Sequence, residues 1–258
     1  MLDHIQIEDV LFLDIETVPQ YPDFSRLDET TQQLWAHKSA PICKEGQTPA
    51  DVYDRAGIYA EFGKIICISV GFVYYLPDGQ MAFRTKSSFG DHESELLKDF
   101  SEVIHRFSRQ HSKMLLCAHN GKEFDFPYIA RRMLIHGLTL PVALDNAGKK
   151  PWETQFIDTM ELWRFGDYKN YTSLKLLTHI FGIPSPKDDI DGSQVAGVYW
   201  QEKDVLRIVR YCEKDVLAIA QLLLRYRGLK LITAENVSST TDFSLLNAAG
   251  TCAPAGYV

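Results

Sequence analysis

The chain has 258 residues, with 27 Lys and Arg against 34 Asp and Glu, a formal net charge of −7, 45% hydrophobic and 24% charged residues. This length permits one large domain with its own core, and the composition excludes a collagen, a disordered chain or a small disulfide scaffold. No apolar run approaches the roughly 20 residues that cross a bilayer, and the N-terminus lacks a secretory signal pattern, so we expect a cytoplasmic protein without a membrane partner.

The first third of the chain predicts a strand, an insertion and a hairpin. Residues 10–13 form an apolar run typical of a buried strand, which ends at Asp14. Four prolines interrupt residues 19–60, and we interpret this segment as an insertion with two helical pieces. Residues 64–75 are β-branched and aromatic, and the Pro-Asp-Gly turn that follows predicts a hairpin with 81–84 as the second strand.

The remainder predicts helices that alternate with short strands. Helical spacing of apolar residues predicts helices over 92–109, 125–136, 172–181 and 201–227, and short apolar runs predict strands over 114–118 and 156–158. A hairpin followed by this alternation implies a mixed α/β sheet covered by helices. We assign residues 1–230 to one domain that carries the 19–60 insertion, and residues 231–258 to a C-terminal tail, either flexible or docked.

Two acidic residues follow the first predicted strand. Asp14 and Glu16 are separated by one residue, so in an extended chain both side chains project from the same face. Two close carboxylates repel each other unless a cation or a proton lies between them. The pair therefore indicates a cation site, and the alternative is a strand that leaves the core through polar residues.

A second cluster lies between a predicted strand and a predicted helix. The Asn120-Gly121 pair favours a tight turn that brings the backbone near a ligand. Asp125 is placed to cap the following helix, with Pro127 in its first turn. Capping alone would explain Asp125, but one carboxylate can both cap a helix and bind a metal.

A third cluster lies on the last long helix. Tyr211 and Asp215 are four residues apart and therefore lie on one helix face, beside its apolar stripe. An inward-facing aspartate is costly without a partner or a metal. The alternative is an aspartate at the edge of the stripe that pairs with Arg207, Arg210 or Lys214.

In order and separation, these clusters resemble the D-x-E, N-x(4)-D and Y-x(3)-D motifs of the DEDD, or DnaQ-like, 3′–5′ exonucleases, and the tyrosine resembles the DEDDy branch. The segments NGKEFDFPYI and YCEKDVLAI resemble the proofreading exonuclease domain of family B DNA polymerases, and the stand-alone predicted PolB-like 3′–5′ exonucleases are similar over roughly residues 8–228. The resemblance implies a ribonuclease H-like fold, with a mixed five-stranded sheet flanked by helices.

The resemblance also implies a catalytic centre with two divalent ions, Mg²⁺ or Mn²⁺. Asp14 would bridge both ions, Glu16 and Asp215 would complete the first site, and Asp125 would help to hold the second. Tyr211 would orient the attacking water, because a phenol with a pKa near 10 is a poor general base at neutral pH.

Four further residues are candidates for binding the substrate. Thr17 is expected to contact the terminal nucleotide and Asn120 a sugar or phosphate. Phe124 is a candidate stacking surface, with core packing as the alternative, and Lys175 is a candidate phosphate ligand, with a solvated lysine as the alternative. His119 is expected to be a packed neighbour, because hard ions prefer oxygen ligands.

The sequence thus favours a metal-dependent 3′–5′ exonuclease acting on single-stranded DNA ends. An exoribonuclease, a catalytically idle nucleic-acid-binding domain and a metal-dependent phosphatase remain as alternatives. The chain lacks the strongly basic character of a tight duplex binder. Too few residues follow Gly228 for polymerase fingers, palm or thumb, so we expect a nuclease that works alone or beside a separate replication or repair protein.

Overall fold

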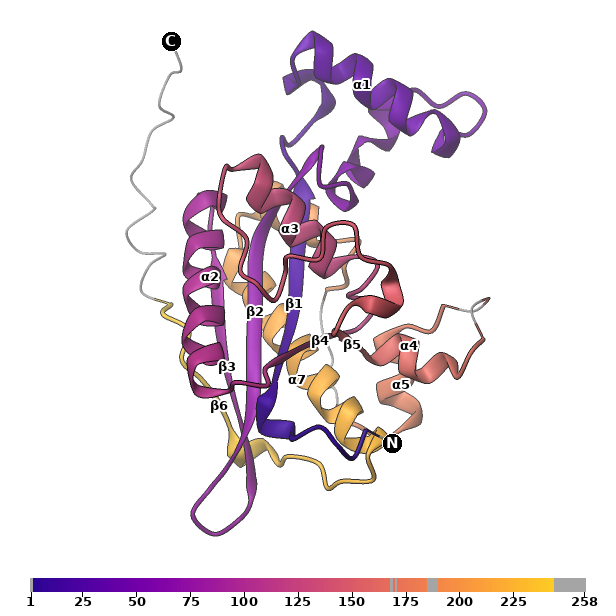
Figure 1. Ribbon diagram of the computed structural model, residues 1–258. Coiled ribbons are helices and arrows are strands. Elements are labelled where there is room, and N and C mark those ends of the chain that lie inside the picture. The colour runs from indigo at the N-terminus through magenta and orange to yellow at the C-terminus, as the bar shows by residue number, and fades with distance from the viewer. Residues whose placement is uncertain (1, 168, 170, 185–189, 244–258) are drawn as a thin grey trace.

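The computed structural model describes residues 2–167, 169, 171–184 and 190–243, and a mixed sheet lies at its centre (Figure 1). The described strands are β1 (Val10–Pro19), β2 (Gly63–Tyr75), β3 (Met81–Phe89), β4 (Leu115–Ala118), β5 (Ile157–Asp158) and β6 (Val237–Ser239), in the spatial order β5-β4-β1-β2-β3-β6. Strand β2 is antiparallel to β1 and β3, whereas β4 is parallel to β1 and β5, and β6 is parallel to β3.

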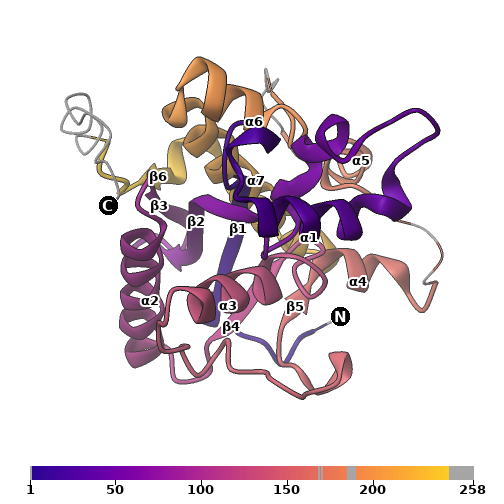
Figure 2. The same cartoon turned by 90° about the horizontal axis from the view of Figure 1, so that it is seen from above.

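Helices cover both faces of this sheet. The described α-helices are α1 (Glu29–Ser39), α2 (Glu93–Gln110), α3 (Asp125–Ile135), α4 (Thr159–Arg164), α5 (Leu174–Ile180), α6 (Val195–Gly197) and α7 (Val205–Tyr226). Seen from above, α2 and α3 lie on one face, and α7 lies on the other (Figure 2). The fold class expected from the sequence, a mixed α/β sheet flanked by helices, is confirmed.

The sheet has six strands where five were expected. Strand β6 pairs with β3 in the register Phe83 with Val237, and it comes from the segment assigned to the tail. On α7, the carboxylate of Glu213 accepts hydrogen bonds from Ser239 Oγ at 2.9 Å and from Thr241 Oγ1. This short polar strand has no apolar alternation, so its sequence pattern could not predict it. The rest of the expected tail, residues 244–258, lies outside the described residues.

Alternation along β1 decides which side chains reach the functional face. Leu11, Leu13 and Ile15 belong to the core beneath α2 and α3, whereas Val10 and Phe12 pack with α7. Because side chains two residues apart share a face, the residues after Phe12 on the α7 side are Asp14 and Glu16. The expectation that the strand ends at Asp14 is wrong, since β1 continues to Pro19 with a register shift between Glu16 and Thr17.

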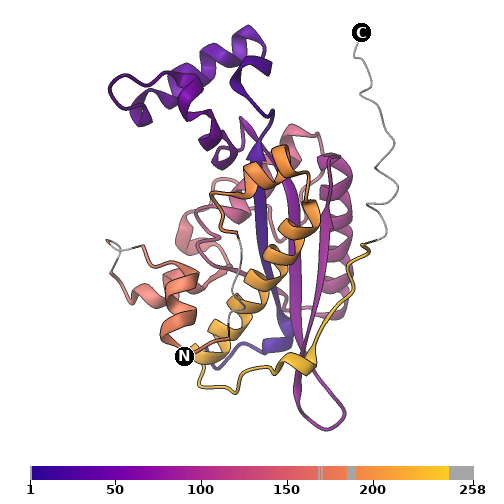
Figure 3. The same ribbon diagram turned by 180° about the vertical axis from the view of Figure 1, so that it is seen from behind.

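The insertion between β1 and β2 forms a small unit with its own core. This unit projects beyond one end of the sheet (Figures 1 and 3). Its longest helical pieces are α1 and a 3₁₀ helix, Pro49–Ile58, and two three-residue 3₁₀ helices, Phe24–Arg26 and Ala40–Ile42, accompany them. The fully buried Trp35 anchors the unit, because its indole Nε1 donates to Pro49 O at 2.8 Å and its ring packs edge-on against Tyr53 and Phe62.

A buried ion network joins this insertion to the body. The Glu93 carboxylate accepts from Arg132 Nε at 2.9 Å and from the Ile65 amide at 2.8 Å, and it also contacts His136 Nε2 at 2.8 Å. Arg132 Nη1 donates in turn to Ala60 O at 2.8 Å, at the end of the insertion. Burial alone would raise the pKa of Glu93, but the hydrogen bonds and charge of Arg132 outweigh burial and lower it.

Candidate active site

A cavity of about 500 Å³ opens between β1, the insertion, the β4–α3 loop and α7. Eight residues expected at the site line it, namely Asp14, Glu16, Thr17, Asn120, Phe124, Asp125, Tyr211 and Asp215. The structure does not bring Lys175 into this lining. That lysine is exposed on α5, and its charge acts on Asp191.

Three elements deliver the four carboxylates to this cavity. Asp14 and Glu16 come from the middle of β1, Asp125 is the first residue of α3, and Asp215 lies one turn after Tyr211 on α7. Strands β1 and β4 run parallel, so the carboxyl-terminal parts of both point to this cavity. In open α/β sheets, ligands bind at that end of the strands.

The carboxylates destabilise one another's charged forms. Burial raises the pKa of Asp14 well above its usual value, and the charges of Asp125, Glu16 and Asp215 add to this effect. Burial and the charge of Asp215 likewise raise the pKa of Glu16. The pKa of Asp125 is raised to about 7, mainly by burial. Such a cluster needs protons or cations to offset its charge.

Asp125 does not cap its helix as expected. The N-cap position belongs to Phe124, which makes no side-chain cap hydrogen bond, and Asp125 follows as the first helical residue. The Asp125 carboxylate instead accepts a hydrogen bond from the Ile15 amide at 3.2 Å. This bond ties the start of α3 to β1 and holds Asp125 close to Asp14 and Glu16.

Tyr211 faces the same carboxylates from α7. Its hydroxyl hydrogen-bonds to Asp215, and burial together with the charges of Asp215 and Glu16 raises its pKa well above the usual value. The phenol is therefore neutral near pH 7 and serves as a hydrogen-bond donor.

The buried Cys212 lies beside Asp14 and Glu16 and was not assigned a role from the sequence. One ligand atom each of Asp14, Glu16 and Cys212 lies within 4.8 Å of the others. The Cys212 thiol donates to Asp14 Oδ2 at 3.4 Å, and burial raises its pKa well above the usual value, so it remains protonated. The available donors are therefore carboxylate oxygens, which suit a hard divalent cation such as Mg²⁺ or Mn²⁺.

The loop that carries Asn120 is held by a carboxylate that the sequence analysis missed. Asp158 accepts from the Asn120 and Lys122 amides at 3.0 Å each, and from the Met160 amide of α4 at 2.9 Å. Asn120 adopts a left-handed φ of 63°, and its buried Oδ1 has no hydrogen-bond partner among the described residues. An aspartate directly before a helix is a typical N-cap, so the sequence around Asp158 contained a pattern that could have indicated a structural role for this residue.

We expect Gly121→Ala to disturb this loop. A Cβ at position 121 would lie 2.4 Å from Ala118 Cβ and 2.9 Å from Phe126 Cε2, so the loop or α3 must move. Overpacking of this kind costs about 1–3 kcal/mol of unfolding free energy, which chemical denaturation measures. Gly197→Ala is the control, because its Cβ meets nothing within 4 Å. Equal stability of both variants would contradict the expectation.

The remaining expected residues have structural partners as well as places in or beside the cavity. Thr17 hydrogen-bonds to the Tyr128 hydroxyl. The half-buried ring of Phe124 lies 5.3 Å from the ring of Tyr128, so it both packs against the core and lines the cavity. His119 contacts Thr172 O through Nε2 at 2.9 Å, and burial lowers its pKa, which agrees with its expected role as a packed neighbour.

Several lining residues lacked a sequence signal. The insertion contributes Asp54, Arg55, Gly57 and Ile58. Their place depends on tertiary contacts that have no local pattern.

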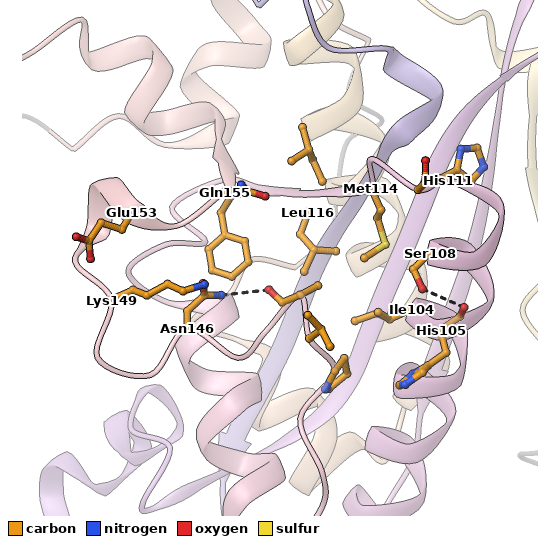
Figure 4. A pocket seen from close by; sticks show the side chains of 16 residues that line it. Ile104, His105, Ser108, His111, Met114, Leu116, Asn146, Lys149, Glu153 and Gln155 are labelled. Atoms are coloured by element: carbon orange, nitrogen blue, oxygen red, sulfur yellow. Dashed lines mark hydrogen bonds between the residues drawn. The ribbon is translucent and has the colours of Figure 1, made fainter.

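A second cavity, of about 420 Å³, lies at the start of β4 and shares no lining residue with the acidic cavity (Figure 4). Ile104 and His105 of α2 border it on one side, and Asn146 and Lys149 on the other. Glu153 is its single lining carboxylate among the described residues, so it offers no comparable cation site.

The fold and cavity define an α/β protein with an acidic site suited to hard cations. Residues 58–242 match a family model described as a predicted 3′–5′ exonuclease related to the exonuclease domain of PolB, and the chain belongs to this family. The match includes Asp125, Tyr211 and Asp215, and it begins after Asp14 and Glu16.

Among solved structures, the chain is similar to the family B DNA polymerase from the hyperthermophilic archaeon Pyrobaculum calidifontis, with 16% sequence identity and a TM-score of 0.44. The similarity covers 84% of this chain and 24% of the polymerase, so this chain corresponds to about a quarter of that protein. In the part of the chain that the structure describes, no helix has both the length and the apolar character needed to cross a bilayer.

Proposed function

We propose that the protein is a metal-dependent 3′–5′ exonuclease that hydrolyses phosphodiester bonds at the 3′ end of single-stranded DNA by a two-metal-ion mechanism. The observation that carries this proposal is the convergence of four carboxylates and Tyr211 in one open cavity. The raised pKa values of Asp14, Glu16 and Asp125 support a site that is completed by cations.

The four carboxylates would share the cations between them. Asp14 would contribute to both sites, Glu16 and Asp215 to the first, and Asp125 to the second. When bound, two divalent ions would neutralise phosphate charge and lower the pKa of the attacking water. The protonated Cys212 would keep the Asp14 carboxylate oriented through its hydrogen bond.

The other lining residues would position the substrate and the water. Tyr211, neutral and able to donate, would orient the attacking water. The unpartnered Oδ1 of Asn120 would accept a hydrogen bond from a sugar hydroxyl. Thr17 would contact the terminal nucleotide, and Phe124 would offer its ring as a stacking surface to the base.

A degradation assay on 5′-labelled single-stranded DNA and on matched RNA tests the proposal. With Mg²⁺ or Mn²⁺ we expect a DNA ladder that shortens from the 3′ end, and we expect chelator or Asp215→Ala to abolish it. This variant also excludes a contaminating nuclease. Stronger RNA cleavage would identify an exoribonuclease instead. Binding without cleavage would indicate an idle binding domain, and turnover of small phosphate monoesters alone would indicate a phosphatase.

A further inference from the structure

The insertion forms one wall of the acidic cavity. Its 3₁₀ helix, Pro49–Ile58, lies against β1 so closely that a Cβ at Gly57 would meet the Val18 carbonyl carbon at 3.0 Å. The Tyr128 hydroxyl of α3 donates to Gly57 O at 2.8 Å and fixes this helix from the other side. The residues on either side of Gly57 are therefore held in place against the catalytic face.

Arg55 is the cation that this wall presents to the cavity. Its side chain is exposed and lines the cavity, and among the described residues it has neither an ion pair nor a hydrogen bond. The other charged lining residues are all acids, namely Asp14, Glu16, Asp54, Asp125 and Asp215. An unpartnered guanidinium at the rim of an acidic cavity is available to an anion from outside.

The chemistry of the substrate supplies such an anion. In a single strand, the scissile phosphate would lie at the carboxylates, and the next phosphate toward the 5′ end would lie nearer the rim. Arg55 makes no ion pair with the carboxylates, so it is better placed for this second phosphate than for the scissile one. A guanidinium binds phosphate through two parallel hydrogen bonds.

We propose that Arg55 is a substrate-positioning residue that binds the phosphate on the 5′ side of the scissile bond, and that the insertion is thereby a part of the substrate-binding site. This inference rests on the proposed exonuclease function. The exposed side chains of Ile58 and Tyr171 line the same cavity and offer apolar surfaces to unpaired bases.

Two substrates distinguish a contact of Arg55 with the second phosphate from a contact with the scissile phosphate. An oligothymidylate carries the second phosphate, whereas thymidine 5′-monophosphate p-nitrophenyl ester carries only the scissile one. For Arg55→Ala we expect kcat/KM on the oligonucleotide to fall roughly 10- to 100-fold, the usual range for a lost hydrogen bond to a charged group. Turnover of the ester should remain unchanged, and Arg55→Lys should restore part of the loss.

Salt dependence and binding give independent readouts. Loss of one phosphate contact should reduce the slope of log affinity against log salt concentration by about 0.7. Fluorescence anisotropy with the same oligonucleotide in Ca²⁺ should show a matching rise in Kd. Lys44→Ala is the control, because it removes the same charge from an exposed position in the insertion that does not line the cavity.

The outcomes distinguish this inference from the proposed function. Equal loss on both substrates would assign Arg55 to the scissile phosphate and overturn the inference, as would unchanged kinetics on both. If the wild type cleaves neither substrate, the exonuclease proposal fails, and the anisotropy measurement still decides whether Arg55 binds the strand. An unchanged Kd in Arg55→Ala would overturn the inference in every case.

Discussion

Asp14→Asn is expected to lower the exonuclease rate by about three or more decades while raising the melting temperature of the metal-free protein. The rate falls because Asp14 is the carboxylate expected to serve both cation sites. The melting temperature rises because the charges of Asp125, Glu16 and Asp215, together with burial, disfavour the Asp14 anion in the folded state. An amide of the same shape removes this repulsion.

Thermal denaturation with and without Mn²⁺ measures the second effect. A ligand that binds only the folded state stabilises it. Mn²⁺ should therefore raise the melting temperature of the wild type, and it should raise that of Asp14→Asn by less. Glu102→Gln, on the exposed face of α2, is the control. A lower melting temperature of metal-free Asp14→Asn would contradict the repulsion argument, and retained cleavage would contradict the proposed site.

Glu93→Ala is expected to lower the free energy of unfolding by about 3–5 kcal/mol. The substitution leaves the Arg132 guanidinium buried without its carboxylate, and loss of one partner of a buried pair has this cost. It also removes the acceptor for the Ile65 amide. Urea denaturation at pH 7 measures the effect.

The loss of unfolding free energy in Glu93→Ala depends on pH, and the direction of this dependence follows from the pKa of Glu93. The folded-state pKa of Glu93 lies below its usual value of 4.5, so its contribution is present above about pH 4.5 and disappears as the pH falls through the folded-state value. The difference in unfolding free energy between the wild type and Glu93→Ala should therefore become smaller at acidic pH. Glu95→Ala is the control, because Glu95 is exposed on the same helix. This variant should neither lose unfolding free energy nor show a pH-dependent difference from the wild type.

Local periodicity was sufficient to predict how the acidic residues are oriented. The one-residue spacing of Asp14 and Glu16 placed both on one face of β1, and the four-residue spacing of Tyr211 and Asp215 placed both on one face of α7. These predictions succeeded because backbone geometry alone fixes such relations. Periodicity alone could not predict that these residues lie close to Asp125. That prediction came from the fold that the resemblance to a known family implies.

Other features depended on long-range contacts. The support that the Asp158 carboxylate gives to the Asn120 amide spans 38 positions of the chain. Arg55 reaches the cavity because Gly57 packs against β1, and no pattern near residue 55 indicates this. Lys175 had a suitable charge and a suitable place in the sequence, but α5 directs it outside the lining.

Strand β6 also has a consequence for self-association. Without it, residues 83–85 of β3 would present free amide and carbonyl groups at an outer boundary of the sheet, and such groups recruit strands from other molecules. β6 covers this boundary with a strand of three residues, two of which are serines. A chain shortened before Val237 would therefore gain a tendency to polymerise, even with every residue of the acidic cavity intact.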